Sequence, residues 1–423
     1  MRTVGLIVEY NPLHNGHVYH FQQAKKISGA EAAVAVMSGC FLQRGEPAIV
    51  DKWARAEMAL RMGIDLVIEL PAVYAPQPAE WFAFGAVSAL DATGIVDCLC
   101  FGSESGEIGW MRRLAREMRD ESPDFRRLMK RELKKGTSYP AAYSAAIGRY
   151  ADECKGGREN AEFMRGVPDD ELARPNNILG LHYLIALERL GSAIEPLTVA
   201  RAKAEYHQQD ITDRRIASAT AVRRLLFESR KPESAAPYVP DYTLDVLRRE
   251  WANGRAPVGW ESFARPLFAH LLNRSAEDLA RLAEVSEGLE HRIKLALARI
   301  PADAGEPVEA LLTALKTKRY TRTKLQRMLA NILLNREKAL LTREELRRGV
   351  PYLRILGFTE KGRQLLKRMK QTSRVPIVTR VAKHRHPWLE LDLKASAIYA
   401  LAYGEVSSRE MLRDFTQPPI RLA

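Results

Sequence analysis

The first 110 residues alternate between short apolar runs and segments in which apolar residues recur every three or four positions. The apolar runs cover residues 3–10, 30–39, 64–71 and 96–102. Each run is apolar at nearly every position, which is typical of strands buried on both faces of a parallel sheet. The segments between the runs have the length and spacing of helices. The pattern therefore predicts an α/β fold built on a doubly wound parallel sheet.

Beyond residue 110 the apolar spacing is mostly helical, with one further strand expected at residues 194–202. Residues 231–243 contain three prolines and show no periodicity, which indicates a domain boundary. We therefore expect an α/β domain over residues 1–230 and a mostly α-helical domain over residues 231–423.

Ligands of doubly wound sheets bind outside the carboxyl ends of the strands, where the strand order reverses. Four loops should reach that edge, at residues 11–17, 38–47, 70–80 and 101–107. They are also the stretches of this region richest in Gly, Pro and polar residues. The functional residues are therefore expected in these loops.

The net charge of +13 is concentrated in one part of the chain. Residues 316–385 hold 21 Lys and Arg against 4 Asp and Glu. A solvated helix face usually carries both signs, so a block of one sign favours a polyanionic partner such as nucleic acid. Within it, cations surround one tyrosine, which could stack on an unpaired base while the cations bind phosphates. The expected nucleic-acid contacts are Lys316, Lys318, Arg319, Tyr320, Arg322, Lys324 and Arg327.

Four cysteines at irregular spacing do not make a disulfide framework and indicate a reducing compartment. No secretory leader and no run of 18 apolar residues is present, so we expect neither secretion nor a membrane span. A cytoplasmic location follows from these expectations. The sequence does not indicate an oligomeric state.

The string HNGH, residues 14–17, lies between the first expected strand and the first expected helix. Gly16 allows the backbone to approach a ligand, and the helix start offers unpaired N–H groups to an anion. His14 and His17 could both donate hydrogen bonds to phosphate oxygens and stabilise charge during attack on phosphorus. The alternative is structural, with His14 capping the turn and His17 packing on the helix. The position after the first strand favours the phosphate role.

The string IASATAVR, residues 216–223, supplies a second candidate phosphate site. Ser218 and Thr220 are suited to a helix N-terminus, and either could simply cap it. Together, HNGH and IASATAVR resemble the two signatures of the HIGH nucleotidyltransferase superfamily. The resemblance implies that both hydroxyls meet the β- and γ-phosphates of ATP and that Arg223 neutralises the leaving pyrophosphate. It also implies a Rossmann-like HIGH nucleotidyltransferase catalytic domain.

Longer strings in the first 220 residues or so resemble the bacterial tRNA(Met) cytidine acetate ligase family. They are GLIVEYNPLHNGHVYH, MSGCFLQRGEPAIVDKWARAEMAL, FGSE, GTSYP, RPNNILGLHY and RAKAEYH. The resemblance implies a ligase that activates acetate with ATP, giving acetyl-adenylate and pyrophosphate. It then implies transfer of the acetyl group to N4 of the wobble cytidine of elongator tRNA(Met), making N4-acetylcytidine and AMP.

The same resemblance implies an ATP site. Its residues are Ile7, Val8, Glu9, Tyr10, Asn11, Pro12, Leu13, His14, Asn15, Gly16, His17, Val18, Tyr19, His20, Gly102, Asn176, Arg201 and Ala202. Gly102 ends a strand at the ligand edge, which leaves room for adenine or ribose. A helix start explains Asn176 equally well, and a surface ion pair is an alternative for Arg201.

The loop at residues 38–47 offers a candidate for acetate. The guanidinium of Arg44 could hold the carboxylate, or it could pair with Glu46 and order the loop. Cys40 departs from the family pattern, in which we expect Asn, so an essential polar role at that position is in doubt. Mg²⁺ is expected with ATP, although no carboxylate cluster in the sequence identifies a metal site.

Two other functions remain open. One is an adenylyltransferase acting on a small metabolite, such as a nucleotide or pantetheine phosphate, which would not need a strongly basic segment. The other is a non-catalytic tRNA-binding protein on an inherited fold, against which the intact HNGH string argues.

Overall fold

The computed structural model describes the chain except for residues 138, 155–170, 201–216, 302–303 and 423. Five parallel strands form the centre of the sheet in the order β5-β4-β1-β2-β3. Their bounds are β1 Thr3–Val8, β2 Ala32–Ser38, β3 Leu66–Leu70, β4 Cys98–Ser103 and β5 Glu195–Ala200. The expected parallel sheet is confirmed: four strands lie within the predicted runs, and β4 extends one residue beyond its run, to Ser103.

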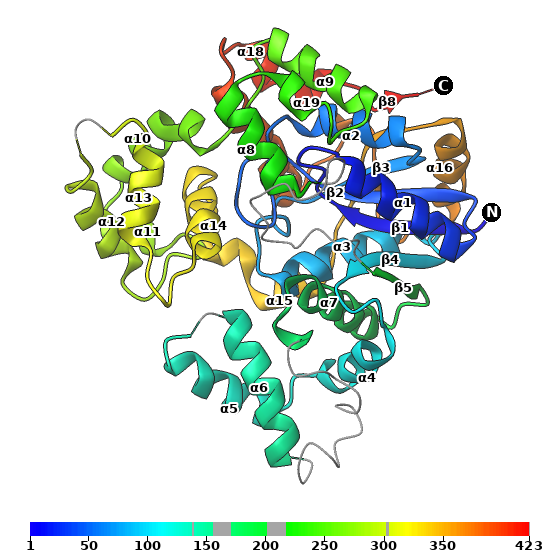
Figure 1. The fold of residues 1–423 in the computed structure, drawn as a ribbon, viewed down its shortest axis with the longest axis horizontal. Coiled ribbons are helices and arrows are strands. Elements are labelled where there is room, and N and C mark those ends of the chain that lie inside the picture. The colour runs from blue at the N-terminus through cyan, green and yellow to red at the C-terminus, as the bar shows by residue number, and fades with distance from the viewer. Residues whose placement is uncertain (138, 155–170, 201–216, 302–303, 423) are drawn as a thin grey trace.

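Helices cover both faces of this sheet (Figure 1). Val34 and Val36 of β2 face a core shared with α3 (Ala79–Thr93), α4 (Gly109–Met118) and α7 (Pro175–Leu190). The alternating residues Ala35 and Met37 face a core shared with α1 (Asn15–Ser28), α2 (Lys52–Met62) and α8 (Ala219–Ser229). Because neighbouring side chains of a strand point to opposite faces, an almost wholly apolar strand can fill both cores.

The strand order reverses between β1 and β4, since the chain runs β1, β2, β3 to one side and then returns to the other. Arg55 of α2 fixes the carboxyl ends of two of these strands. Its guanidinium is fully buried and donates to the carbonyls of Glu9 (2.7 Å), Ser38 (3.0 Å) and Gly39. These bonds hold the start of the loop at residues 39–47 against the end of β1.

Two helices, α5 (Pro123–Lys134) and α6 (Tyr139–Cys154), pack on each other beside α4 and form the lowest part of the molecule in Figure 1. The 3₁₀ turn η2 (Glu171–Ala173) then leads into α7.

The chain from residue 241 to 348 is helical, as expected. Its helices are α9 Asp241–Ala252, α10 Ala264–Asn273, α11 Ala276–Ala280, α12 Leu289–Leu297, α13 Pro307–Leu315, α14 Arg322–Leu333 and α15 Arg343–Arg347. The helices α10 to α14 surround another core at the left of Figure 1. They share it with Cys40 and Phe41 of the loop at residues 39–47 and with Ala395 and Tyr399 near the C-terminus. Burial raises the pKa of the Cys40 thiol to about 12, so this thiol acts as an apolar side chain in that core.

The C-terminal part returns to the sheet, which the sequence analysis did not predict. Strand β6 (Leu353–Phe358) pairs antiparallel with β3, and β7 (Ile377–Val378) and β8 (Ile420–Arg421) pair with β6. The remaining helices are α16 Glu360–Thr372, α17 Pro387–Tyr399, α18 Ser408–Met411 and α19 Arg413–Thr416. The expected boundary at residue 230 therefore does not bound the sheet, although it does precede the helical part.

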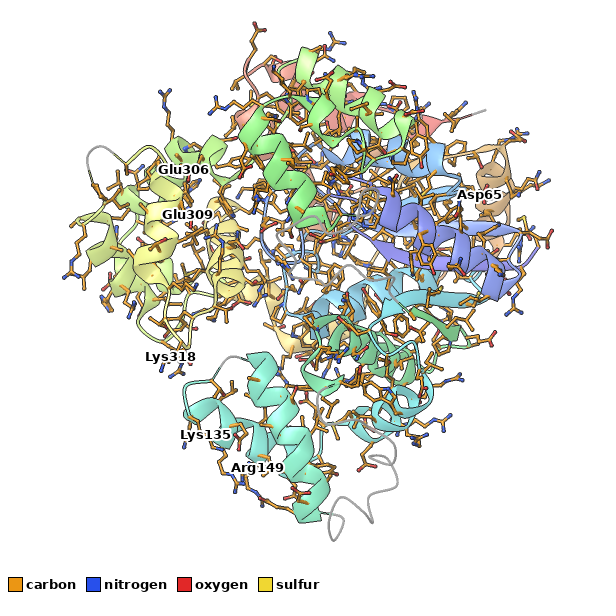
Figure 2. All side chains as sticks on the ribbon, viewed as in Figure 1. Asp65, Lys135, Arg149, Glu306, Glu309 and Lys318 are labelled. Carbon is orange, nitrogen blue, oxygen red and sulfur yellow. The ribbon has the colours of Figure 1, made fainter. Side chains whose placement is uncertain are left out.

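Buried charges join this return to the sheet. Lys52 contacts Glu69 and Asp414 at 2.8 Å each, and Arg354 contacts the same two carboxylates at 3.0 and 3.1 Å. Asp65, labelled in Figure 2, also connects the two parts, because it accepts from the backbone N–H of Ala33 and from the hydroxyl of Thr359. The C-terminal segment is thus bonded to the core of the α/β sheet.

Candidate functional site

A cavity of about 280 Å³ opens at the carboxyl edge of the sheet, where the strand order reverses between β1 and β4. This is the edge at which the sequence analysis expected the functional residues. Its walls come from the ends of β1, β4 and β5, the starts of α1, α3 and α8, the loop at residues 39–47, and α7. The predicted residues that line it are Ile7, Val8, Glu9, Tyr10, Asn11, His14, Gly16, His17, Tyr19, His20, Arg44, Gly102, Asn176, Ser218, Thr220 and Arg223.

The two histidines of HNGH form a capping box at the start of α1. The N–H of Gly16 donates to Nδ1 of His14 at 3.1 Å, and the N–H of His14 donates to Nδ1 of His17 at 3.2 Å. The ring centroids lie 3.8 Å apart. A neutral imidazole whose Nδ1 accepts a hydrogen bond carries its proton on Nε2. Capping therefore orients both rings and places a proton on Nε2 of each, so the structural and the phosphate-binding interpretations are compatible.

The backbone bends sharply just before this cap. Tyr10 has a φ of 49°, a left-handed conformation that a non-glycine residue seldom adopts. Its ring is buried and meets the edge of the His17 ring, with centroids 5.0 Å apart. Strained backbone held by packing is common at functional sites. Here it turns the chain from the end of β1 into the start of α1.

Four residues of the predicted ATP segment, Pro12, Leu13, Asn15 and Val18, do not line the cavity. Leu13 is fully buried in the core that the sheet shares with α1, α2 and α8. The side chain of Asn15 donates to the carbonyl of Pro237 at 3.3 Å. These side chains support the turn. The predicted Arg201 and Ala202 lie outside the described residues, so their placement is left open.

A second helix N-terminus reaches the same cavity. Ser218 caps α8, accepting from the N–H of Ala221 at 3.1 Å. Arg223, one turn later, donates to the carbonyl of Asn11 (3.0 Å) and to Glu46 (3.1 Å). The sequence analysis considered Arg44 as a partner of Glu46, and in the structure Glu46 pairs with Arg223. Two helix N-termini facing one cavity concentrate positive potential and N–H donors there, which suits a chain of phosphates.

The carboxylate of Glu9 organises the loop at residues 39–47. It accepts from the backbone N–H of Gln43 at 2.7 Å and from the hydroxyl of Ser38 at 3.1 Å. Burial raises the pKa of Glu9, while these hydrogen bonds and the cations of Arg55 and Arg44 oppose the rise. Glu9 therefore holds the loop so that Arg44 lines the cavity.

The sequence analysis missed the apolar wall of the cavity. Its members are Phe82, Phe101, Leu179, Tyr183 and Val199. One signal was available, since Leu179 and Tyr183 follow Asn176 at helical spacing and share its face. The others come from separate elements and meet only in the folded chain. An apolar wall beside an anion site suits the flat base of a nucleotide.

Asn176 joins two of the cavity walls. Its amide donates to Glu104 at 2.6 Å, and the backbone N–H groups of Asn176 and Asn177 donate to the same carboxylate at 3.1 and 2.8 Å. In return, the carbonyl oxygen of the Asn177 side chain accepts from the N–H of Glu104 at 2.9 Å. This reciprocal arrangement ties the loop after β4 to the start of α7. Asn176 thus has a structural role and also lines the cavity.

The predicted tRNA contacts lie on a different part of the surface, before and within α14. Most of their charge is neutralised locally: Arg319 pairs with Glu287, Arg322 with Glu309, and Lys324 and Arg327 with Glu284. Figure 2 labels Glu309 and Lys318 on this helical cluster. Tyr320 is 6% exposed and its hydroxyl donates to Glu287, so its ring packs in the cluster and is not presented for base stacking. The expectation of a stacking tyrosine is corrected.

The described ranges contain no cluster of three side chains able to hold a metal ion. The two carboxylates that line the cavity, Glu9 and Glu46, already accept hydrogen bonds from Gln43 and Arg223. Within those same ranges, every helix is too short or too polar to cross a bilayer.

Known proteins resemble this chain along its whole length. Residues 1–414 match the HIGH Nucleotidyl Transferase family. The tRNA(Met) cytidine acetate ligase of Caldanaerobacter subterraneus subsp. tengcongensis is 39% identical over 427 residues, covering 100% of both chains. That of Bacillus velezensis is 40% identical over 428 residues, covering 100% of this chain and 97% of the relative. The crystal structure of Thermotoga maritima TmcAL bound with alpha-thio ATP superposes with a TM-score of 0.88 at 35% identity, with 100% of both chains covered.

Proposed function

Because this chain belongs to the HIGH nucleotidyl transferase family and, within it, to the tRNA(Met) cytidine acetate ligases, we propose that it acetylates N4 of the wobble cytidine of elongator tRNA(Met) with acetate and ATP. The observation that carries this proposal is one cavity shared by two helix N-termini, two imidazole N–H groups and two arginines. The protein acts in the cytoplasm, where tRNA and ATP are found.

The reaction has two steps. In the first, an acetate oxygen attacks the α-phosphorus of ATP, the bond to the β-phosphate oxygen breaks, and pyrophosphate leaves. In the second, N4 of cytidine attacks the acetyl carbon, AMP leaves and one N4 proton is released. The exocyclic amine of cytosine is a poor nucleophile, so a mixed anhydride is needed to make its acylation favourable.

Positioning and electrostatics supply the catalysis of the first step. The Nε2–H groups of His14 and His17 donate to oxygens of the reacting phosphate, where charge develops. The start of α8, with Ser218 and Thr220, holds the β- and γ-phosphates. Arg223, fixed by its bonds to Asn11 and Glu46, neutralises the departing pyrophosphate.

Acetate and the base contact different walls of the cavity in this proposal. Arg44 binds the acetate carboxylate through its planar guanidinium, on the loop held by Glu9. The apolar wall of Phe101 and Tyr183 receives the adenine ring. Arg201 and Ala202, which the family resemblance implicates, complete the site.

Mg²⁺ is proposed as a companion of ATP. The described residues offer no three-ligand cluster for it. Mg²⁺ usually keeps several waters and binds through nucleotide phosphates, so it enters with the triphosphate without a dedicated protein cage.

Acetate-dependent exchange of labelled pyrophosphate into ATP tests the first step, and the variant His14→Asn separates the capping role of His14 from its phosphate role. Asn is a good N-cap but has no imidazole, so His14→Asn keeps the cap and removes the Nε2–H donor. We expect His14→Asn and His17→Ala each to lower exchange by about 10²–10³-fold, the usual effect of losing one such donor. Wild-type exchange in both variants would reject the site.

The matched control is His291→Ala, because the side chain of His291 is 69% exposed on the helical cluster. It should leave the exchange rate unchanged. Incorporation of labelled acetate into elongator tRNA(Met), with mass analysis of the product nucleoside, tests the second step. Exchange that is independent of acetate, with transfer of the adenylyl group to a phosphorylated metabolite, would favour the metabolite adenylyltransferase instead.

A further inference from the structure

Helix α5 carries two rows of cations that differ in their partners. The first row is neutralised, and its ion pairs are Arg127–Asp124 (3.1 Å), Arg131–Glu153 (2.8 Å) and Lys135–Glu132 (2.6 Å). Figure 2 labels Lys135 together with Arg149 of α6, which also contacts Glu132. Arg131 and Arg149 therefore connect α5 to α6, and the ion pairs of the first row leave little free charge.

The second row is Arg126, Lys130 and Lys134, and all three side chains are exposed. Among the residues that the structure describes, none provides a carboxylate within ion-pairing distance of these three cations. They are spaced four residues apart, or about 6 Å along the helix axis. Like charges at this spacing repel and destabilise a helix. A partner with regularly spaced negative charges would relieve this repulsion.

The apolar face of α5 cannot serve a membrane surface, because it is already packed. Phe125 and Leu128 are buried, and the Phe125 ring meets those of Tyr143 and Tyr150 of α6 edge-on, with centroids 5.5 and 6.0 Å apart. A basic amphipathic helix that binds membranes needs that face free. What the row presents to solvent is charge alone.

The α5–α6 pair is attached to the wall of the proposed active site. The hydroxyl of Ser144 in α6 donates to the carbonyl of Leu172 at 2.6 Å, and Leu172 lies in η2, which leads directly into α7. The start of α7 carries Asn176, which lines the cavity. The row thus lies on an element bonded to the site that would hold the reacting cytidine.

We propose that Arg126, Lys130 and Lys134 bind the phosphate backbone of the tRNA substrate and hold it while the cytidine enters the cavity. This inference rests on the proposed function, because it assigns that reaction's RNA substrate to a surface. Phosphate contacts position an RNA without reading its sequence. The row therefore supplies affinity and orientation, and not the choice of anticodon.

The test compares two charge-matched variants of the full-length protein. Lys130→Gln/Lys134→Gln removes two charges from the second row, and Arg127→Gln/Arg131→Gln removes two from the first. Burial raises the pKa of Glu121, and nearby cations, Arg126 among them, oppose that rise. Arg126 is therefore left unchanged, so that its interaction with Glu121 is kept. Elongator tRNA(Met) binding is measured over a range of salt concentrations, alongside acetate-dependent pyrophosphate exchange without tRNA.

Each phosphate contact contributes about 0.7–0.9 to the slope of log affinity against log salt. We expect Lys130→Gln/Lys134→Gln to reduce that slope by about 1.4–1.8 and weaken tRNA binding at least tenfold, with exchange unchanged. The first-row variant should keep the wild-type slope. Equal effects of the two variants, or no effect of the second-row variant, would overturn the proposal.

Loss of binding to anionic lipid vesicles in the second-row variant, with tRNA binding intact, would also overturn the proposal and indicate a membrane partner. Failure of the wild-type protein to acetylate or bind tRNA would reject the proposed function itself. That outcome is distinguishable, because it does not depend on either variant.

Discussion

At the scale of single residues, several side chains of this protein have both a structural and a chemical task. His14 and Ser218 each cap a helix and line the cavity, and Asn176 joins two walls of it. A cap fixes the direction of a side chain at the point where backbone N–H groups are unpaired. The same residue types that begin a helix are therefore suited to phosphate binding.

His182 gives a residue-scale prediction on stability. It is 4% exposed in α7, and burial lowers its pKa to about 4 from the ordinary 6.5. His182 therefore binds a proton below about pH 6.5 in the unfolded chain but only below about pH 4 in the folded chain. The folded state loses stability as the pH falls from 6.5 to 4. Between pH 7 and 4.5 the loss from this group is about 2 kcal/mol.

We expect His182→Phe to remove about 2 kcal/mol of the change in unfolding free energy between pH 7 and pH 4.5. Urea titration at these two pH values measures the change. Phenylalanine keeps the ring contact with Tyr143. His291→Gln, at an exposed site, is the control and should leave the pH dependence as it is. An unchanged profile in His182→Phe would show that His182 binds its proton at the same pH in the folded and the unfolded chain.

At the scale of elements, the loop at residues 39–47 connects the sheet to the helical cluster. Gly45 has a φ of 82°, and a Cβ built on it would lie 2.2 Å from the backbone nitrogen of Arg327 in α14. The neighbouring Glu46 accepts from Gln326 of α14 and from Arg223 of α8. The loop that carries Arg44 is thus held from three sides.

Gly45→Ala should displace this loop from α14. We expect a loss of several kcal/mol of stability, since a left-handed alanine costs about 1 kcal/mol and the clash is with backbone. The KM for acetate should rise more than that for ATP, because Arg44 lies on the displaced loop. Thermal unfolding and exchange kinetics measure both effects.

Gly29→Ala is the matched control for Gly45→Ala. Gly29 also has a positive φ, of 60°, but a Cβ there would have no neighbour within 4 Å. Gly29→Ala should lower stability only by the backbone strain and leave the KM values for acetate and ATP unchanged. Equal effects of the two substitutions would mean that contact with α14 does not position the loop.

At the scale of the whole molecule, the chain returns to its first sheet after more than 100 residues of helix. Strand β6 pairs with β3, and its Arg354 completes the buried cluster with Lys52, Glu69 and Asp414. Removing one partner from a buried ion cluster leaves an uncompensated charge, which typically costs about 3–5 kcal/mol. The two predicted parts therefore depend on each other for stability.

A fragment of residues 1–230 should accordingly fail to fold as a stable unit. It would expose β3 as an edge strand and leave Lys52 and Glu69 without Arg354 and Asp414. Circular dichroism and urea unfolding of the fragment beside the full chain measure this. A fragment that unfolds cooperatively and binds ATP would contradict the prediction.

Much of the parallel sheet and of the site could be predicted from local pattern. The five strands and the helices α1, α3, α7 and α8 lie where the apolar spacing placed them, because each buries its own repeat against a neighbour. The strings around His14 and Ser218 follow strand and loop signals along the chain. By contrast, β6 was taken as part of a helical domain, since a single short strand carries no sign of a distant partner.

Local pattern also could not show which cations of the charge block at residues 316–385 are paired with carboxylates. The sequence shows its many cations, but their carboxylate partners Glu284, Glu287 and Glu309 lie outside the block. On α5, the spacing alone could not separate the paired row from the row of Arg126, Lys130 and Lys134, because Glu153 comes from α6. Which cations remain available to a polyanion is decided by these contacts.

The sequence by itself determined the doubly wound sheet, the edge at which a ligand binds and the two phosphate-binding strings, because all three depend on local spacing and helix starts. Only the tertiary structure decided which side chains meet. It brought Phe82, Phe101 and Tyr183 into one wall, joined Glu46 to Arg223, buried Tyr320 and returned β6 to the sheet. The physical reason is that such contacts form between residues far apart in the chain, whose pairing depends on the packing of the whole core.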